Sequence, residues 1–326
     1  MARIAIVGGY GLVGKLIARE LRDAMDEVDL VLVGRAPDDH GAVAEAVGAS
    51  LARFDVADPD ADRSVFDGCD VIIAAVQDPG EVLVAAAIDA GAAYLTITRG
   101  PDRIAPTVFA AVQRQPSRPI VPAAHWMAGA VTWAALDAAR GFERVDGVLM
   151  TTLFDYADPI GPLTAQPSED FGKDMAVIRR DGAWRQVAAA ETGRMAERAD
   201  GPAYGVQAMS VLDVVSTGTA TGAADVRFEI GTGDSAGTLA GREASADIDI
   251  VLSGIIDGKP GKRQISLRHP QGQAHLTALG AALIARGLAD SPVNGGGIAL
   301  PETVVDPASA IAALQAAGLT VTTRDI

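Results

Sequence analysis

A short apolar run followed at once by a cluster of glycines most restricts how this chain can fold. Residues 3–7 are rich in β-branched side chains, and the run that follows them is Gly8-Gly9-Tyr10-Gly11-Leu12-Val13-Gly14. Beyond it, apolar residues recur every four positions at Val13, Ile17 and Leu21, which is typical of a helix. The order of strand, glycine-rich turn and helix predicts that the chain opens with a βα unit.

The glycines Gly9, Gly11 and Gly14 match the pattern G-x-G-x-x-G directly after the predicted strand. In that pattern the first glycine permits a tight turn, the second lets a pyrophosphate approach the backbone, and the third lets the helix pack on the strand. The helix N-terminus adds free N–H donors and the positive end of its dipole. We therefore expect a bound dinucleotide; a purely structural turn is the alternative. The turn residues expected to contact the cofactor are Gly9, Tyr10, Gly11, Leu12, Val13 and Gly14.

The same glycines also match most of a P-loop, because the run from Gly9 to Lys15 reads G-x-x-x-x-G-K. A P-loop needs a Ser or Thr hydroxyl at the next position to hold Mg²⁺, and this chain has Leu16 there. Leucine cannot coordinate a metal. The sequence therefore argues against ATP hydrolysis.

The residue that ends the second predicted strand, at 28–33, bears on the choice between NAD and NADP. Gly34-Arg35 follows this strand and lies ~20 residues beyond Gly14, as the dinucleotide fingerprint requires. Arginine offers a 2′-phosphate a charge-assisted fork, whereas an acidic residue would bind the ribose 2′-OH and repel the phosphate. We expect NADP(H), with NAD(H) less favoured; a merely solvated Arg35 is the alternative. Asp55 ends the third strand and is expected either to meet the adenine or to form a turn or helix cap.

Strands and helices keep alternating through residues 28–122, which predicts βαβ units and a parallel sheet covered on both faces. We therefore expect the N-terminal domain to have an α/β fold, a Rossmann doubly wound parallel sheet. Ligands of such sheets lie outside the carboxyl ends of the strands. The predicted strands are 3–7, 28–33, 50–54, 70–76, 94–97 and 119–122, with helices at 12–21, 41–47, 81–90 and 104–115. The strand-end residues expected to contact the cofactor are Ala75, Val76, Gln77 and Thr98.

From about residue 145 the pattern changes to apolar runs separated by turn signals such as Asp181-Gly182, which predicts an antiparallel sheet in a second, α+β domain. The predicted strands are 148–154, 175–179, 184–187, 209–216, 226–230, 246–256, 264–268 and 319–323. Helices are expected at 273–287 and 307–317, and long loops at 155–173 and 191–205. We expect a dinucleotide-binding domain over 1–128 and a substrate-binding and dimerisation domain over 129–291, with 292–326 packing back onto the first domain.

Composition excludes several partners. The net charge of −15 repels polyanions, so neither nucleic acid nor an anionic membrane is expected to bind. Cys69 is the only cysteine, and it lies in an apolar pattern typical of a buried, inert thiol. The N-terminal apolar run is far shorter than a signal peptide or membrane span, so we expect a cytoplasmic protein. The spacing of His269 and His275 does not suggest a metal site, and we predict no metal.

The motifs above resemble those of the saccharopine dehydrogenase-like oxidoreductases. The resemblance rests on residues 8–14, 34–35 and 55, on the helix and strand at 87–94, and on residues 297–302. It implies a nicotinamide-binding domain, a mixed α/β substrate domain that often mediates dimerisation, and reduction of C=N, C=C or C=O bonds. Thr96 stands where the family usually carries an acidic residue, and only Arg99 is well placed to bind a dicarboxylic amino acid. Saccharopine itself is therefore not expected as the substrate.

Two residues are candidates for proton transfer. His125 follows the sixth strand, where an imidazole could donate a proton to the developing oxyanion or carbanion. Two alternatives for His125 are that it lines the site without taking part in catalysis, or that it simply packs beside Trp126. Tyr156, next to Asp155, is the second candidate, although the chain lacks the Tyr-x-x-x-Lys pair of short-chain dehydrogenases. Surface packing is the alternative for Tyr156.

The sequence thus predicts an NADPH-dependent reductase of a small-molecule metabolite. A catalytically silent NADP(H)-binding sensor or scaffold is one alternative, and a non-redox enzyme that binds another nucleotide is a second. The runs at 148–154, 209–215 and 248–256 have apolar residues in too many consecutive positions to leave one polar face. We therefore expect a homodimer formed by the second domain; cover by helices and loops of the same chain is the alternative.

Overall fold

The chain divides into two compact units, which are described separately. The computed structural model describes residues 1–98, 100–101, 103–161, 175–290 and 295–326. The first unit contains Met1–Ala124 and Thr277–Val305, and the second contains His125–Leu276 and Asp306–Ile326. In this division 277–290 belongs to the first unit and 306–326 to the second, whereas the sequence analysis placed 129–291 in the second domain and 292–326 against the first.

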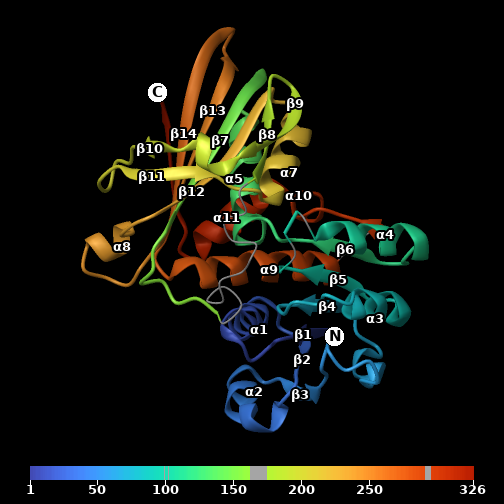
Figure 1. Cartoon of the computed structure of the whole chain (residues 1–326). Helices are drawn as coiled ribbons and strands as arrows, with labels where there is room; N and C mark the ends of the chain where they lie inside the picture. The colour runs from blue at the N-terminus through green and yellow to red at the C-terminus, as the bar shows by residue number, and fades with distance from the viewer. Residues whose placement is uncertain (99, 102, 162–174, 291–294) are drawn as a thin grey trace. The chain divides into compact units, whose positions relative to one another are not determined.

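The first unit is built on a parallel sheet of seven strands in the order β15-β6-β5-β4-β1-β2-β3 (Figure 1). The chain runs outward from β1 in both directions, so the strand order reverses between β1 and β4, where such folds bind ligands. The doubly wound α/β class is therefore confirmed. The strands are β1 Ala2–Val7, β2 Val28–Gly34, β3 Ser50–Arg53, β4 Val71–Ala74, β5 Ala93–Thr96, β6 Pro119–Pro122 and β15 Gly297–Ile298. The helices are α1 Leu12–Ala24, α2 Gly41–Val47, α3 Val82–Ala90, α4 Ile104–Arg114 and α10 Pro301–Val304.

The central strands of this sheet are apolar at consecutive positions because helices cover both faces. Ile4, Ile6 and Ile72 are fully buried. Helix α1 packs its buried residues, among them Ile17 and Leu21, against the sheet. The four-residue period read from the sequence therefore marks the face of α1 that meets the core.

The second unit is built on a mixed and mostly antiparallel sheet, as expected. Its main path runs β10-β11-β12-β7-β13-β14-β16, and the hairpin β8-β9 joins it at β12. Strands β7 and β12 are parallel neighbours. The strands are β7 Arg144–Phe154, β8 Met175–Arg180, β9 Ala183–Ala188, β10 Arg194–Ala196, β11 Tyr204–Ala208, β12 Asp225–Thr232, β13 Ala246–Ile256, β14 Lys259–His269 and β16 Thr320–Asp325.

Helices cover one face of this sheet. Helix α5 (Ala130–Ala139) contacts β13 and β14, α7 (Leu212–Thr221) contacts β12, and α11 (Pro307–Ala316) packs on α5. Figure 1 shows the long strands β7, β13 and β14 running side by side. Helix α8 (Ala236–Leu239) also belongs to this unit, whereas α9 (Gly272–Asp290) belongs to the first unit from Thr277 onward. The fully buried Ile250 and Leu252 alternate along β13 with the half-buried Val251, so this strand does have a buried and a more exposed face.

Two predicted elements were wrong. Residues 209–216 are not a strand, because α7 begins at Leu212 and directs Asp213 and Ser216 to buried polar contacts that outweigh the β-propensity of the valines. The predicted loop at 191–205 contains β10 and the start of β11, where Tyr204 packs with Leu153. The final strand β16 pairs with β14 and therefore holds the end of the chain in the second unit. Part of the predicted loop at 155–173 lies outside the described residues.

Candidate functional site

The glycine-rich turn is closely packed at two of its three motif glycines. A Cβ atom on Gly14 would lie 2.1 Å from the carbonyl oxygen of Gly8, and one on Gly9 would lie 2.8 Å from that of Ile6. Gly11 is different, because it is exposed and a Cβ there would approach only the Gly8 oxygen, at 3.1 Å. The backbone therefore requires glycine at positions 9 and 14, whereas Gly11 leaves space beside the turn.

The N-terminus of α1 carries uncapped N–H groups beside that space. Its N-cap residue Gly11 offers no side chain, and the first turn contains no acidic residue. The first intrahelical bond runs from the N–H of Lys15 to the oxygen of Gly11, at 3.1 Å. The N–H groups of Leu12, Val13 and Gly14 precede it and have no acceptor within the helix. These donors and the helix dipole fit an anionic group such as a pyrophosphate.

The ends of β4 and β5 meet the glycine-rich turn. The hydroxyl of Thr98 donates to the carbonyl oxygen of Val76 at 2.8 Å. Gly8, at φ +83°, lies against Val76, because a Cβ on this glycine would be 2.7 Å from Val76 Cγ1. The N–H of Ala75 donates to the carbonyl oxygen of Val7 at 2.9 Å. The side chain of Gln77 is exposed. The structure thus brings Val76 and Thr98 to the turn, while Arg99 lies outside the described residues.

Sequence reasoning missed the contributions of Gly8 and Asp78 to this edge of the sheet. Asp78 is buried and accepts hydrogen bonds from the N–H groups of Val82 at 2.9 Å and Leu83 at 2.8 Å. It therefore caps the N-terminus of α3. The N-cap position of α3 itself is occupied by Glu81, whose side chain makes no capping bond, so the usual N-cap signal did not point to Asp78.

The end of β2 is held by the side chain of Tyr10. Its hydroxyl accepts a hydrogen bond from the N–H of Ala36 at 3.0 Å. Arg35, between Gly34 and Ala36, is exposed and has no hydrogen bond or ion pair with any described residue. Asp55 uses its carboxylate in its own turn, where it accepts from the N–H of Ala57 at 3.0 Å.

His125 lies in a buried polar contact in the second unit. Its Nε2 atom is 2.8 Å from the hydroxyl oxygen of Ser216 on α7, and the imidazole is 5% exposed. Nδ1 has no hydrogen-bond partner among the described residues. Burial lowers the pKa of His125 to about 3, because desolvation disfavours the charged imidazolium. The side chain is therefore neutral at physiological pH.

The turn after His125 has a strained backbone. Met127 and Ala128 have φ values of 53° and 52°, in the left-handed region that costs a residue with a side chain about 1–2 kcal/mol. The buried carboxylate of Asp213 accepts from the N–H of Trp126 at 2.7 Å and from the hydroxyl of Thr132 at 2.8 Å. Strain of this kind persists only where surrounding contacts impose it, and it is concentrated at functional sites. The sequence analysis did not name Asp213 or Ser216 as partners of this turn, because helix α7 was itself missed.

The second catalytic candidate, Tyr156, has different surroundings. It is 79% exposed on the loop after β7, and its ring lies edge-on to Phe154 at a centroid distance of 5.4 Å. Its neighbour Asp155 is buried and accepts from the N–H of Ser235 at 2.8 Å and from the hydroxyl of Thr238 at 2.5 Å. Asp155 thus holds the turn before α8, and the Tyr156 hydroxyl lies on the surface.

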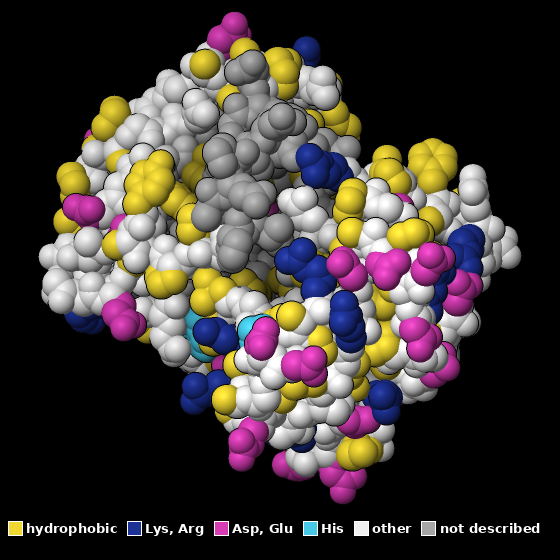
Figure 2. All heavy atoms as spheres, turned by 60° about the horizontal axis from the view of Figure 1, so that its bottom comes forward, with side chains coloured by type: hydrophobic (Ala, Val, Ile, Leu, Met, Phe, Trp, Pro, Cys, Tyr) yellow, Lys and Arg dark blue, Asp and Glu magenta, His cyan; other side chains and the backbone are white. Residues whose placement is uncertain are grey.

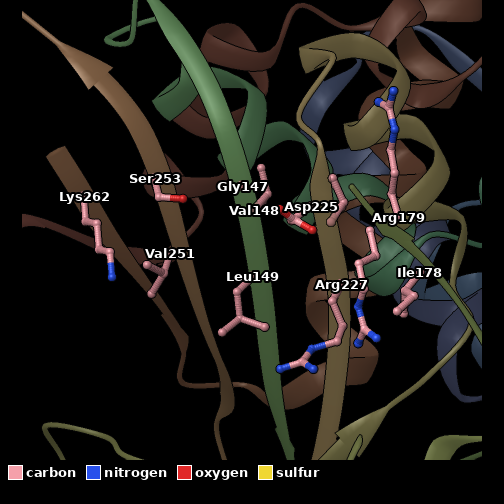
Figure 3. Close-up of a pocket in the computed structure, with 12 residues that line it drawn as sticks. Gly147, Val148, Leu149, Ile178, Arg179, Asp225, Arg227, Val251, Ser253 and Lys262 are labelled. Atoms are coloured by element: carbon pink, nitrogen blue, oxygen red, sulfur yellow. The ribbon is translucent and has the colours of Figure 1, made fainter. Parts of the chain in front are cut away.

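A groove of about 310 Å³ opens on the other face of the second sheet, away from α5. Figure 3 shows Leu149 and Val251 between the cationic side chains of Lys262 and Arg227. None of the residues that line it was predicted as a site residue. In the described part of the chain, no three His, Cys, Asp or Glu side chains form a group that could hold a metal ion.

On the face drawn in Figure 2, acidic side chains lie among basic and hydrophobic ones. No helix within the described ranges combines the length and the apolar character needed to cross a membrane.

Comparisons with known proteins identify the fold. No family model matches this chain, and no curated protein matches it by sequence. Among solved structures, saccharopine dehydrogenase (L-Glu forming) from Saccharomyces cerevisiae superposes with a TM-score of 0.72 over 100% of both chains, at 13% identity. The chain has the saccharopine dehydrogenase fold. The expected resemblance is therefore confirmed at the level of the fold.

Two further structures match less closely. GenD2 from gentamicin A biosynthesis, solved in complex with NAD, has a TM-score of 0.50 at 13% identity over 100% of this chain and 96% of that chain. Apo scyllo-inositol dehydrogenase from Lactobacillus casei has a TM-score of 0.50 at 13% identity over 96% and 94%. At these identities the likeness is one of fold.

Proposed function

We propose that this protein is an NAD(P)-dependent oxidoreductase that uses NADPH to reduce a C=O, C=N or C=C bond of a small metabolite. The observation that carries the proposal is the open turn at Gly11 beside the uncapped N-terminus of α1. A pyrophosphate would accept hydrogen bonds from the N–H groups of this first turn. The fold shared with saccharopine dehydrogenase, and with GenD2 solved in complex with NAD, supports a nicotinamide dinucleotide as the class of cofactor.

The residues at the strand ends would hold the rest of the cofactor. Arg35 would pair with the 2′-phosphate, while Val76 and Thr98 would contact the dinucleotide at the ends of β4 and β5. When bound, the nicotinamide supplies a hydride to the substrate. His125 is neutral, so its role would be to orient a polar group by hydrogen bonding and not to release a proton by titration.

A second candidate function is a catalytically silent NADP(H)-binding sensor or scaffold. It is favoured by the surroundings of the two predicted acids, because His125 is buried and neutral and Tyr156 is exposed. A panel of ketones, imines and enoates assayed by loss of NADPH absorbance separates the two functions. Turnover of any panel member supports the reductase, whereas tight NADPH binding with no turnover across the panel supports the silent protein.

We expect NADPH to bind at least about 10-fold more tightly than NADH. The reason is that a charge-assisted contact between Arg35 and the 2′-phosphate contributes about 1.5–3 kcal/mol, which is about 10- to 100-fold in affinity. Isothermal titration calorimetry with NADPH and with NADH measures the ratio of the two dissociation constants. Arg35→Ala should reduce the preference to near unity with little change in the affinity for NADH. An unchanged ratio in this variant would show that the assignment of Arg35 is wrong.

We also propose a homodimer formed through the open sheet face of the second unit. Leu149 and Val251 are cross-strand neighbours there and are only half-buried in one chain. Covering them with a second copy would remove apolar surface from water. Light scattering behind a sizing column should give about twice the 33.3 kDa of one chain, and Val251→Glu should shift the mass toward the monomer. A wild-type mass near that of one chain at micromolar concentration would exclude the dimer.

A further inference from the structure

Tyr10 makes three contacts with the segment that carries Arg35. Besides the hydrogen bond from Ala36, its ring stacks on His40, with centroids 3.9 Å apart and planes 15° apart. Its hydroxyl also lies against the Cα of Gly34, because a Cβ there would be 2.1 Å from the hydroxyl oxygen. Only glycine at position 34 leaves room for the Tyr10 side chain.

These contacts surround Arg35 on both sides along the chain. Gly34 precedes it and Ala36 follows it, and His40 ends the 3₁₀ turn Pro37–His40 that leads into α2. Tyr10 itself lies between Gly9 and Gly11, so one side chain connects the pyrophosphate turn to the end of β2. The backbone on which Arg35 stands is therefore fixed relative to that turn.

Fixing this backbone matters because Arg35 has no partner of its own among the described residues. A flexible, solvated arginine must lose conformational freedom when it pairs with a phosphate, and preorganisation reduces that loss. The 3₁₀ turn Pro37–His40 carries the exposed carboxylates of Asp38 and Asp39. If this segment moved and brought these carboxylates closer to the cofactor, they would repel a 2′-phosphate.

We propose that Tyr10 and His40, with Gly34 opposite them, determine the preference for NADPH by positioning Arg35. This proposal rests on the proposed NADPH-dependent function. Tyr10 and His40 are positioning residues, and they act on the affinity for the 2′-phosphate through the arginine. The contact with the pyrophosphate does not depend on them.

The test measures the ratio of the NADH and NADPH dissociation constants, which a general loss of folding or of pyrophosphate binding would not change. Tyr10→Phe keeps the ring and removes the hydrogen bond from the N–H of Ala36, and it should lower this ratio about 3- to 10-fold. Gly34→Ala should lower it similarly with Tyr10 intact, because the new methyl group displaces the flexible ring. His40→Phe retains a stacking ring and should keep the ratio, whereas His40→Ala should lower it.

The double variant distinguishes this inference from the proposed function. If Tyr10 acts through Arg35, then Tyr10→Phe should not lower the ratio further in an Arg35→Ala background. Wild-type protein that binds neither dinucleotide would refute the proposed function. If Arg35→Ala lowers the ratio while Tyr10→Phe and Gly34→Ala leave it unchanged, Arg35 keeps its role and the positioning proposal is overturned.

Discussion

Gly11→Val should weaken binding of NADPH and NADH alike by about 100- to 10,000-fold while the protein stays folded. The expected size corresponds to two lost charge-assisted hydrogen bonds of about 1.5–3 kcal/mol each, from N–H groups that the valine side chain would screen from the pyrophosphate. The fold should tolerate the change because Gly11 is exposed and its Cβ would approach only the Gly8 oxygen, at 3.1 Å. Fluorescence titration of both cofactors measures the loss.

The neighbouring glycine provides a matched control. A Cβ on Gly14 would lie 2.1 Å from a backbone oxygen that cannot move aside cheaply, so Gly14→Ala should destabilise the first unit itself. Circular dichroism melts should therefore separate the variants, with a native-like melt for Gly11→Val and a lowered one for Gly14→Ala. Near-wild-type cofactor affinity in folded Gly11→Val would overturn the dinucleotide site.

Asp213→Ala should lower the free energy of unfolding of the second unit by about 3–5 kcal/mol. The fully buried carboxylate accepts from the N–H of the half-buried Trp126 and from the buried hydroxyl of Thr132, and its removal takes the acceptor from both donors at about 1–3 kcal/mol each. It also removes the contact that holds the strained turn at Met127 and Ala128. Urea unfolding followed by tryptophan fluorescence measures the loss, because all three tryptophans, Trp126, Trp133 and Trp184, lie in this unit.

Two substitutions bracket the expected loss at Asp213. Asp213→Asn keeps one acceptor oxygen and should lose about half as much stability. Asp234→Ala removes an exposed carboxylate of the same unit and should change the free energy of unfolding by less than about 0.5 kcal/mol. If the free energy of unfolding of Asp213→Ala lies within about 1 kcal/mol of the wild-type value, the buried carboxylate does not hold this turn.

The errors of the sequence-based interpretation concern elements whose structure depends on distant partners. The apolar run around Val214 suits a strand or a helix equally well, and the polar residues of α7 settle the matter by meeting the turn after His125. Ser216 is 91 positions from His125 in the sequence, so no local pattern could connect them. The strand β10 was likewise missed, because three residues are too few to show an alternation.

The sequence by itself determined the opening βα unit, the glycine-rich turn and the parallel sheet of the first unit. These features follow from local requirements: backbone space at Gly9 and Gly14, and the burial periods of strands and helices. Only the tertiary structure decided that His125 is buried and neutral, that the C-terminal segment is shared between the two units, and that Tyr10 holds the segment of Arg35. The reason is physical, because desolvation, strand pairing and ring stacking are properties of residues brought together from distant parts of the chain.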